Sequence, residues 1–246
     1  ELWIMKNKNF FGKGISSIEG TTWKFNKDAS KNFDEHVRQS IPHYDDIQKY
    51  ICSLSEWFIK DNSIIYDLGC STGETAKNLV TKYGDKNFKY SGYDLSSTMI
   101  KIAKNKNKKN KKKIIFKLGD INKIDFKKNS DLFISILTFP FLNSDQRIKL
   151  YKKIYKSLNY GGAIIFVDKV RSSKSVYEDM FNQVYFDFKI DNKLKHEQVL
   201  NKSKSIRSAM QLFEIDEINN FLKKAGFKKS EKFFRWFNFV GIIAIK

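Results

Sequence analysis

The chain has 246 residues, of which 41% are hydrophobic and 15% aromatic, and its formal net charge is +19 at pH 7. This composition excludes a disordered chain, and the length allows one elaborated α/β domain with a full core. No run of about 20 apolar residues is present and no signal peptide opens the sequence, so we predict a cytoplasmic protein without a membrane span.

The positive charge comes mostly from lysines that are spread along the chain. The densest run covers residues 101–113, and we predict that it lies in a solvated loop rather than in an RNA-binding patch. Two cysteines, Cys52 and Cys70, are too few for a disulfide framework or a cysteine metal site. We therefore expect neither a bound metal nor direct binding to nucleic acid.

The first 60 residues are expected to form an extension followed by a helical lid. Residues 1–24 carry glycines and hydroxyl groups without a clear period and are interpreted as the extension. Polar and apolar residues mixed at helical spacing predict a first helix over residues 26–40, which ends before Pro42. Apolar residues three and four apart predict a second, amphipathic helix over residues 43–59. Both helices are expected to pack over a binding site.

The stretch from Ser63 to Thr75, SIIYDLGCSTGET, is typical of a strand, a glycine-rich turn and a helix. Gly69 and Gly73 allow a positive φ and a close approach of a ligand to the backbone. Asp67 places a carboxylate at the carboxyl end of the strand, where ligands bind in open α/β sheets. A dinucleotide loop would read G-x-G-x-x-G, and an acid beside a pyrophosphate is unfavourable. The loop therefore favours S-adenosylmethionine (SAM), with its ammonium and sulfonium charges, over a dinucleotide or a purely structural turn.

Two further strands are also followed by acids. Asp94 ends the short strand that begins at Tyr90, where a carboxylate is expected to meet the two ribose hydroxyls. Asp120 follows a run that begins at Ile114, and it would accept from an adenine amino group while the next backbone N–H donates to the ring. Three successive strands that end in aspartate would place these acids along one edge of the sheet, which strengthens the prediction of a SAM site.

The remaining chain completes the α/β repeat with one interruption. Apolar runs predict strands at 130–139 and 163–167, and helical spacing predicts helices that start near Ser97 and near Ser144. A helix at 215–225 is closed by Gly226, and two β-type runs end the chain at 232–237 and 239–245. We therefore predict a Rossmann-like class I SAM-dependent methyltransferase fold over residues 61–246. Its seven-stranded, mostly parallel sheet is interrupted by a helical insertion at about 172–212.

From Phe25 to Lys246 the chain resembles the carboxy-SAM synthase family and its close methyltransferase relatives. The resemblance rests on six short segments: Gln39–Tyr44, Asp67–Ser71, Gly119–Ile121, Leu158–Gly162, Asp187–Lys189 and Phe237–Phe239. It implies an enzyme that carboxylates the methyl group of SAM with prephenate as the carboxyl source. It also implies a homodimer whose product serves a partner enzyme in tRNA wobble-uridine modification.

The resemblance implies a set of SAM-contacting residues: Tyr44, Gly69, Cys70, Ser71, Asp94, Leu95, Asp120 and Ile121. Two positions depart from the family pattern. Ile136 stands, within one residue, where the family places an asparagine near the sulfonium. Ser203, directly after Lys202, stands where the family has an arginine that holds the added carboxylate. Arg207, four residues on, would share a face with Ser203 if the segment is helical.

These departures leave two enzymatic hypotheses. The first, which the sequence favours, is a SAM-dependent methyltransferase that acts on a small-molecule acceptor, because a serine hydroxyl is a poor ligand for a buried carboxylate. The second is a carboxy-SAM synthase, with carboxy-SAM as the bound form of the cofactor and Arg207 in place of the missing arginine. Candidates for a base that deprotonates an acceptor are His43, Tyr185 and Asp168. A third hypothesis is a SAM-fold protein that binds a ligand or RNA without turnover, but the aromatic residues lie in apolar, core-like runs.

Overall fold

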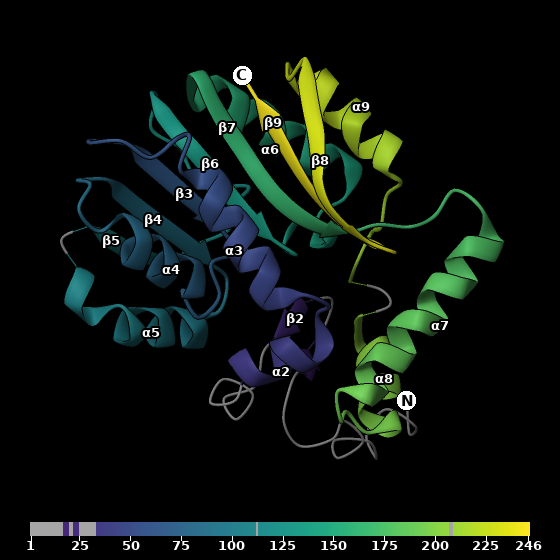
Figure 1. Cartoon of the computed structure of the whole chain (residues 1–246). Coiled ribbons are helices and arrows are strands. Elements are labelled where there is room, and N and C mark those ends of the chain that lie inside the picture. The colour runs from purple at the N-terminus through teal and green to yellow at the C-terminus, as the bar shows by residue number, and fades with distance from the viewer. Residues whose placement is uncertain (1–16, 20–21, 25–32, 112, 207–208) are drawn as a thin grey trace.

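A seven-stranded sheet forms the centre of the computed structural model, which describes residues 17–19, 22–24, 33–111, 113–206 and 209–246 (Figure 1). The strand order is β5-β4-β3-β6-β7-β9-β8. Five strands are parallel: β3 (Ile64–Leu68), β4 (Lys89–Asp94), β5 (Ile114–Leu118), β6 (Ser130–Ile136) and β7 (Leu158–Lys169). The last two strands, β8 (Lys229–Trp236) and β9 (Phe239–Ile245), form an antiparallel pair that adds to the edge of β7. This arrangement confirms the predicted class I methyltransferase fold.

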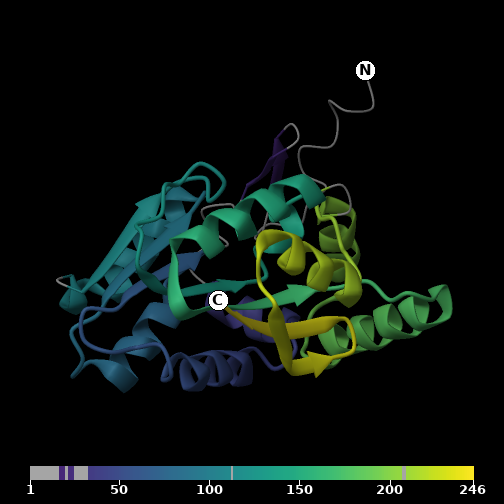
Figure 2. The same cartoon turned by 90° about the horizontal axis from the view of Figure 1, so that it is seen from above.

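Helices cover both faces of the sheet, as the two views show (Figures 1 and 2). One face carries α3 (Tyr44–Ser55), α4 (Glu74–Tyr83) and α5 (Ser97–Lys106), and the other carries α6 (Ser144–Ser157) and α9 (Ile215–Ala225). Side chains of β6 point alternately to the two faces of the sheet, so Leu132 and Ile134 pack with α3 and α4, and Phe133 packs with α6. A strand buried on both sides in this way is apolar throughout, as the sequence of β6 is.

Three helices lie beyond the carboxyl ends of the parallel strands and do not belong to either layer (Figure 1). They are α2 (Phe33–Ser40), α7 (Ser175–Asp191) and α8 (His196–Ile206). Helix α2 falls within the residues predicted as a lid, and α7 and α8, which lie between β7 and α9 in the chain, fall within those predicted as an insertion. Two short 3-10 helices, η1 (Lys108–Asn110) and η2 (Phe139–Phe141), complete the described elements.

Some predicted boundaries are wrong for local reasons. Helix α6 ends at Ser157, and β7 begins at once and runs through Gly161 and Gly162, so its strand is longer than the predicted 163–167. Leu158 pairs with Ser130 there, and the carbonyl of Gly162 accepts from the N–H of Lys246, which keeps the segment in the sheet. The N-terminal part contains a short antiparallel pair, β1 (Ser17–Glu19) and β2 (Thr22–Lys24), where only an extension was expected. Residues 26–32 of the first predicted helix lie outside the described residues.

Helix termini follow their capping signals. The hydroxyl of Ser96 accepts from the N–H of Met99 at the start of α5, which begins at Ser97, where the sequence predicts a helix start. Asn143 and Gln146 form a reciprocal capping box at the start of α6. Gly226 follows α9 with a φ of 115°, which confirms the predicted glycine stop.

An ion pair is completely buried between α6 and the sheet. Arg147 donates from Nη1 to Asp168 Oδ2 at 2.7 Å, and both side chains have no exposed surface. The guanidinium also donates from Nε to the carbonyl of Phe139 at 3.0 Å. This pair joins η2, α6 and β7 at the carboxyl end of the sheet, so it fixes the loop after β6.

Two further features bear on the predicted absence of a membrane span and on the predicted lysine-rich loop, but they do not test these predictions. Among the described helices, none is both long and apolar enough to span a membrane. The lysines of η1 are exposed in the connection before β5 begins. Because β5 is parallel to β3, this connection lies at the edge opposite to the carboxyl ends of the strands.

Candidate functional site

A large cavity of about 1330 Å³ lies between the carboxyl ends of the parallel strands and the helices α2, α7 and α8. All ten residues that the sequence assigned to the cofactor line it: Tyr44, Asp67, Gly69, Cys70, Ser71, Asp94, Leu95, Asp120, Ile121 and Ile136. The structure thus brings together residues from five elements or their connecting loops. Their individual roles in binding SAM stay predictions.

The loop after β3 can form only because of its glycines. Gly69 has a φ of 85°, and a Cβ at this position would lie 1.8 Å from Thr138 Oγ1. Gly73 has a φ of 74° and precedes the first turn of α4, so the helix begins directly at the loop. The loop is also held from β4, because the backbone carbonyl of Tyr93 accepts from the N–H groups of Gly69 and Cys70. The result is a turn held from β4, and its residues Gly69, Cys70 and Ser71 line the cavity.

The three strand-end acids have different environments. Asp67 is buried and accepts a hydrogen bond from the hydroxyl of Tyr90. Burial raises the pKa of the Asp67 carboxyl to about 7, although the bond from Tyr90 opposes this shift. A cation placed beside Asp67 would favour the ionised carboxylate, which agrees with a ligand that carries ammonium and sulfonium charges.

Asp94 and Asp120 have their carboxylates oriented by backbone N–H groups. Asp94 accepts from the N–H of Ser71 at 3.0 Å and from that of Ser96 at 2.8 Å. Burial raises the pKa of Asp94, while the backbone N–H groups oppose the shift. Asp120 accepts from the N–H of Asn122 at 2.9 Å. A carboxylate has about four acceptor positions, so both acids keep capacity for hydroxyl or amino groups of a ligand.

The lid helix is tied to the glycine loop by a network around Lys106. Asp34 on α2 accepts from Thr72 Oγ1 at 2.6 Å and also from the ammonium of Lys106. Lys106 also donates to Glu74 in the first turn of α4 at 2.8 Å. These side chains are only partly exposed, so the network holds α2 over the site more firmly than a surface pair would.

Three lysines line another part of the cavity that the strand-end acids line. Lys169 comes from the end of β7, Lys189 from α7 and Lys202 from α8. The ammonium groups of Lys189 and Lys169 lie 3.6 Å and 4.6 Å from the centroid of the Tyr185 ring. Lys202 Nζ lies 2.9 Å from Nε2 of His36 on α2. The sequence singled out Lys202, next to the family's clamp position, and Lys189, within the segment Asp187–Lys189, but it did not predict that the three lysines line one cavity.

Crowding and burial lower the pKa values of these groups. Burial lowers the pKa of Lys202 to about 8, and burial together with Lys169 and Lys202 lowers that of Lys189 to about 7. Burial also lowers the pKa of Lys169. His36 has a pKa of about 3 because of burial and the nearby lysines, so it is neutral at ordinary pH and accepts from Lys202. Within the described part of the chain, no acidic side chain pairs with any of the three lysines.

The structure does not bring every proposed catalytic residue to the cavity. His43 lies outside it: the residue precedes α3 with a φ of 54°, its ring contacts Asp46 and Phe234, and it is about half exposed. Asp168 is not a free base, because it is sealed in the ion pair with Arg147. Tyr185 lines the cavity, but its hydroxyl donates to the carbonyl of Ser40. Arg207 lies outside the described residues.

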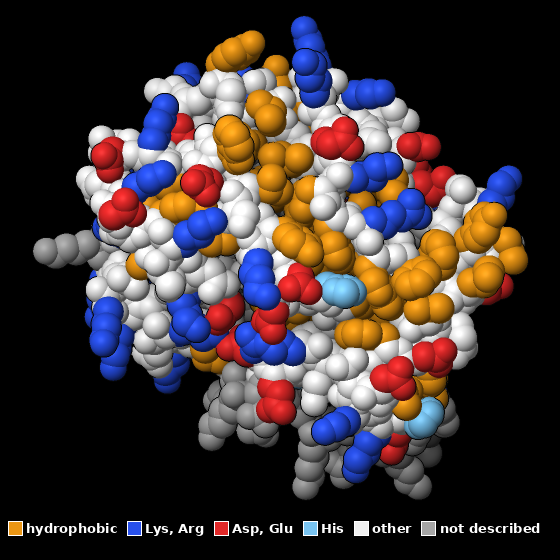
Figure 3. All heavy atoms as spheres, in the orientation of Figure 1, with side chains coloured by type: hydrophobic (Ala, Val, Ile, Leu, Met, Phe, Trp, Pro, Cys, Tyr) orange, Lys and Arg blue, Asp and Glu red, His pale blue; other side chains and the backbone are white. Residues whose placement is uncertain are grey.

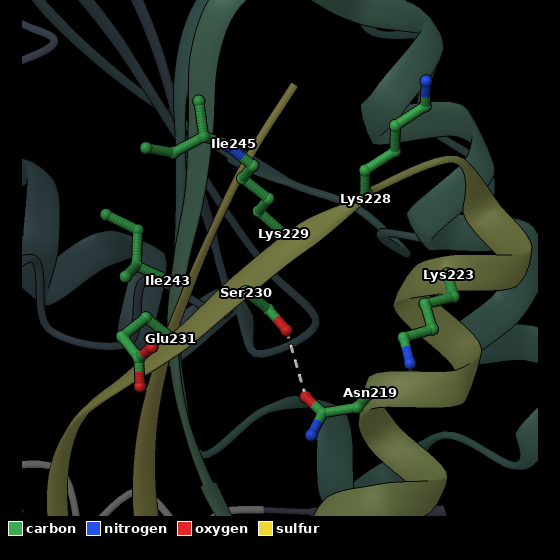
Figure 4. Close-up of a pocket in the computed structure, with 8 residues that line it drawn as sticks. All are labelled: Asn219, Lys223, Lys228, Lys229, Ser230, Glu231, Ile243 and Ile245. Atoms are coloured by element: carbon green, nitrogen blue, oxygen red, sulfur yellow. Dashed lines mark hydrogen bonds between the residues drawn. The ribbon is translucent and has the colours of Figure 1, made fainter.

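A second hollow of about 510 Å³ lies between α9 and β8 (Figure 4). Its lining side chains include Lys223, Lys229 and Glu231, which are exposed. Ser230 Oγ donates to Asn219 Oδ1 across it at 3.1 Å. It is a surface depression, and the predicted cofactor-binding residues line the larger cavity instead.

Comparisons with known proteins agree with this geometry. A family profile described as "Methyltransferase domain" matches residues 65–162. The carboxy-S-adenosyl-L-methionine synthase of Staphylococcus epidermidis is 38% identical over 225 residues, which cover 91% of this chain and 97% of that protein. The carboxy-S-adenosyl-L-methionine synthase of Sulfurimonas denitrificans is 30% identical over 240 residues, which cover 98% of this chain and 100% of that protein.

Solved structures support the fold. Phosphoethanolamine N-methyltransferase 2 of Haemonchus contortus, in complex with SAM, matches with a TM-score of 0.64 and 14% identity, covering 90% of this chain and 57% of that one. A putative SAM-dependent methyltransferase of Methanococcus maripaludis matches with a TM-score of 0.59 and 20% identity, covering 94% and 97%. With the full-length similarity to the curated relatives, these findings show that the chain belongs to the carboxy-S-adenosyl-L-methionine synthase family, as a class I SAM-dependent enzyme with SAM as its cofactor.

Proposed function

We propose that this chain carboxylates the methyl group of SAM and so acts as a carboxy-SAM synthase. The observation that carries this proposal is that the cluster of Lys169, Lys189 and Lys202 lines the same cavity as the strand-end acids. In the reaction, a carbon–carbon bond of the donor breaks and releases its carboxyl group as CO2, and the electron pair left behind expels hydroxide from the donor. The methyl carbon gives up one proton and forms a new carbon–carbon bond to the released carbon, and the proton and the hydroxide leave as water. The resemblance stated above gives prephenate as this donor and tRNA wobble-uridine modification as the use of the product.

The lysines answer the objection that Ser203 raises. A carboxylate on the methyl group makes that end of the cofactor anionic, and burying it without a cation would cost several kcal/mol. Ser203 lines the cavity directly after Lys202, and Lys189 is close enough for its pKa to respond to Lys202. Lys202 on α8 therefore offers a cation beside Ser203, even though the family arginine position holds a serine, and Lys189 on α7 adds positive charge in the same cavity. Arg207 is not needed for this argument.

A methyltransferase that acts on a small anionic acceptor remains the second candidate, because Ser203 lacks the planar, bidentate fork of an arginine. A lysine is a point charge and holds a carboxylate less specifically. In this alternative the same lysines would bind an anionic acceptor, and the methyl group would be transferred instead of modified.

Mass spectrometry separates the two functions. When the purified protein is incubated with SAM and prephenate, we expect a product heavier than SAM by one CO2. A reaction without prephenate and one with heat-denatured protein serve as controls. Recovery of unmodified SAM alone would contradict the proposed activity, and accumulation of S-adenosylhomocysteine with a methylated small molecule would support the second candidate.

We also propose that the chain forms a homodimer through α7. This helix of 17 residues has no buried residue, and Val176, Tyr177 and Met180 are more than half exposed. Figure 3 shows hydrophobic side chains along this helix on the right of the molecule. Such a stripe on a helix that also lines the cavity is typical of an interface. A second copy offers the same stripe and allows a closed two-fold contact.

For this dimer we expect Met180→Glu to shift the protein toward the monomer in sedimentation velocity. The charge would be placed in the apolar stripe of both subunits at once. Tyr160→Glu is the matched control, because Tyr160 is 94% exposed and lies at the start of β7, away from α7. Wild-type protein that sediments as a monomer at micromolar concentration would contradict the proposal.

A further inference from the structure

The cavity contains a cationic corner, formed by Lys169 and Lys189, in which neither lysine forms an ion pair with an acidic side chain of the described residues. Lys169 and Lys189 both lie against one ring, that of Tyr185, at 4.6 Å and 3.6 Å from its centroid. The ring is fixed, because the Tyr185 hydroxyl donates to the carbonyl of Ser40 at 2.9 Å. Described acidic residues do occur nearby, since Asp179 lines the cavity and Glu178 acts on Lys169, but neither forms an ion pair with these lysines. Two ammonium groups gathered in this way are poorly solvated and repel each other.

We propose that Lys169 and Lys189, held against the ring of Tyr185, form a subsite that binds the carboxylate of the second substrate. This inference rests on the proposed function, because it concerns the molecule that reacts with SAM. The subsite is separate from the place next to Lys202 and Ser203 that the carboxylated methyl group would occupy. Lys202 contacts His36, whereas the ammonium groups of Lys169 and Lys189 lie against the face of Tyr185.

The surrounding walls indicate an organic acid rather than an inorganic ion. Phe186, Val199 and Leu200 line the same cavity, as does Phe239 from the end of β9. A hydrated inorganic anion gains nothing from such walls, whereas the hydrocarbon body of an organic acid buries apolar surface against them. The subsite therefore fits a carboxylic acid with an apolar body better than an inorganic anion.

Binding of a carboxylate should be linked to proton uptake. In the empty cavity the pKa of Lys189 is about 7, because of burial and of the charges on Lys169 and Lys202. A bound carboxylate favours the charged ammonium and raises this pKa. The affinity for the carboxylate should therefore fall as the pH rises through 7, and binding at pH 8 should take up a proton. His36 does not contribute, because its pKa of about 3 keeps it neutral over this range.

Phenylacetate and its neutral amide, phenylacetamide, form a matched pair of probes. They are titrated calorimetrically into the full chain loaded with S-adenosylhomocysteine, which fills the cofactor side of the cavity. We expect phenylacetate to bind at least tenfold more tightly than phenylacetamide at pH 7. Lys189→Met and Lys169→Met should each weaken phenylacetate binding at least tenfold and leave phenylacetamide binding unchanged. Lys174→Met is the control, because Lys174 is exposed just before α7 and does not line the cavity.

Proton uptake distinguishes direct contact from a structural role. Titration at pH 8 in two buffers with different ionisation enthalpies should show proton uptake in the wild type, retained in Lys174→Met and clearly smaller in Lys189→Met, where only Lys169 and Lys202 remain to take up protons. Circular dichroism checks that each variant is folded, and Lys189→Gln replaces Lys189→Met if the latter does not fold. Equal affinities for the two probes, or unchanged phenylacetate binding in both lysine variants, would overturn the subsite. Displacement of phenylacetate by inorganic phosphate at lower concentration would overturn its assignment to organic acids.

The two proposals fail in different ways. If phenylacetate binds as expected but no carboxy-SAM forms from SAM and prephenate, the proposed function is wrong and the subsite stands. If carboxy-SAM forms but Lys169 and Lys189 do not affect the binding of phenylacetate, the function stands and the subsite is wrong.

Discussion

Replacing Arg147 with methionine is expected to lower the free energy of unfolding by about 3–5 kcal/mol. The change removes one partner of a fully buried ion pair and leaves the carboxylate of Asp168 without its cation. No other described group can replace the lost interaction, because Asp168 Oδ1 and Arg147 Nη2 have no hydrogen-bond partner among the described residues even in the intact pair. The guanidinium also packs over the ring of Phe213 at 5.0 Å, so packing is lost as well. Urea unfolding followed by circular dichroism measures the effect.

A double variant tests whether the loss comes from the unpaired charge. Arg147→Met combined with Asp168→Leu removes both charges, and we expect it to recover most of the stability lost in the single variant. Lys152→Met, an exposed change on the same helix, should alter the free energy of unfolding by less than about 0.5 kcal/mol. If the double variant is as unstable as Arg147→Met, the packing of the arginine rather than its charge is what stabilises this corner.

The fold was predictable because its signals are local. The turn after β3 needs glycines, the strands of the sheet interior are apolar runs, and caps such as Ser96 mark where helices begin. The extent of β7 was not predictable in the same way. Gly161 and Gly162 are typical of a turn, and only their pairing at the sheet edge, for example between Gly162 and Lys246, makes the segment a strand.

The two sides of the cavity differ in how well the sequence shows them. The acids of the cofactor side follow strands in a regular order, so the parallel sheet must bring them to one edge. The lysines of the other side are three among the 46 lysines and arginines of the chain. The residues next to Lys189 in the sequence do not indicate that its side chain is partly buried. That information arises only when α7 folds over the end of β7. His43 precedes α3 in a left-handed turn and lies outside the cavity that its neighbour Tyr44 lines, which the sequence does not show either.

Asp94→Ala is expected to weaken SAM binding by about 1.5–3 kcal/mol, the range for hydrogen bonds to a charged group, which corresponds to roughly a ten- to hundredfold rise in Kd. The structure adds a second reason to the predicted contact with the ribose. Asp94 accepts from the N–H groups of Ser71 and Ser96, so it also orients the glycine loop on which the cofactor would lie. Isothermal titration with SAM measures the change, and thermal unfolding checks that the variant is folded.

Asp94→Asn separates the two contributions. The asparagine keeps one oxygen that can accept from the loop but loses the charge, so we expect an affinity between those of the wild type and Asp94→Ala. Asp85→Ala is the matched control, because Asp85 is exposed after α4 and does not line the cavity, and its Kd for SAM should not change. Unchanged SAM affinity in a folded Asp94→Ala protein would remove Asp94 from the binding site. Equal losses in the alanine and asparagine variants would instead show that the negative charge, and not the support of the loop, accounts for the contribution of Asp94.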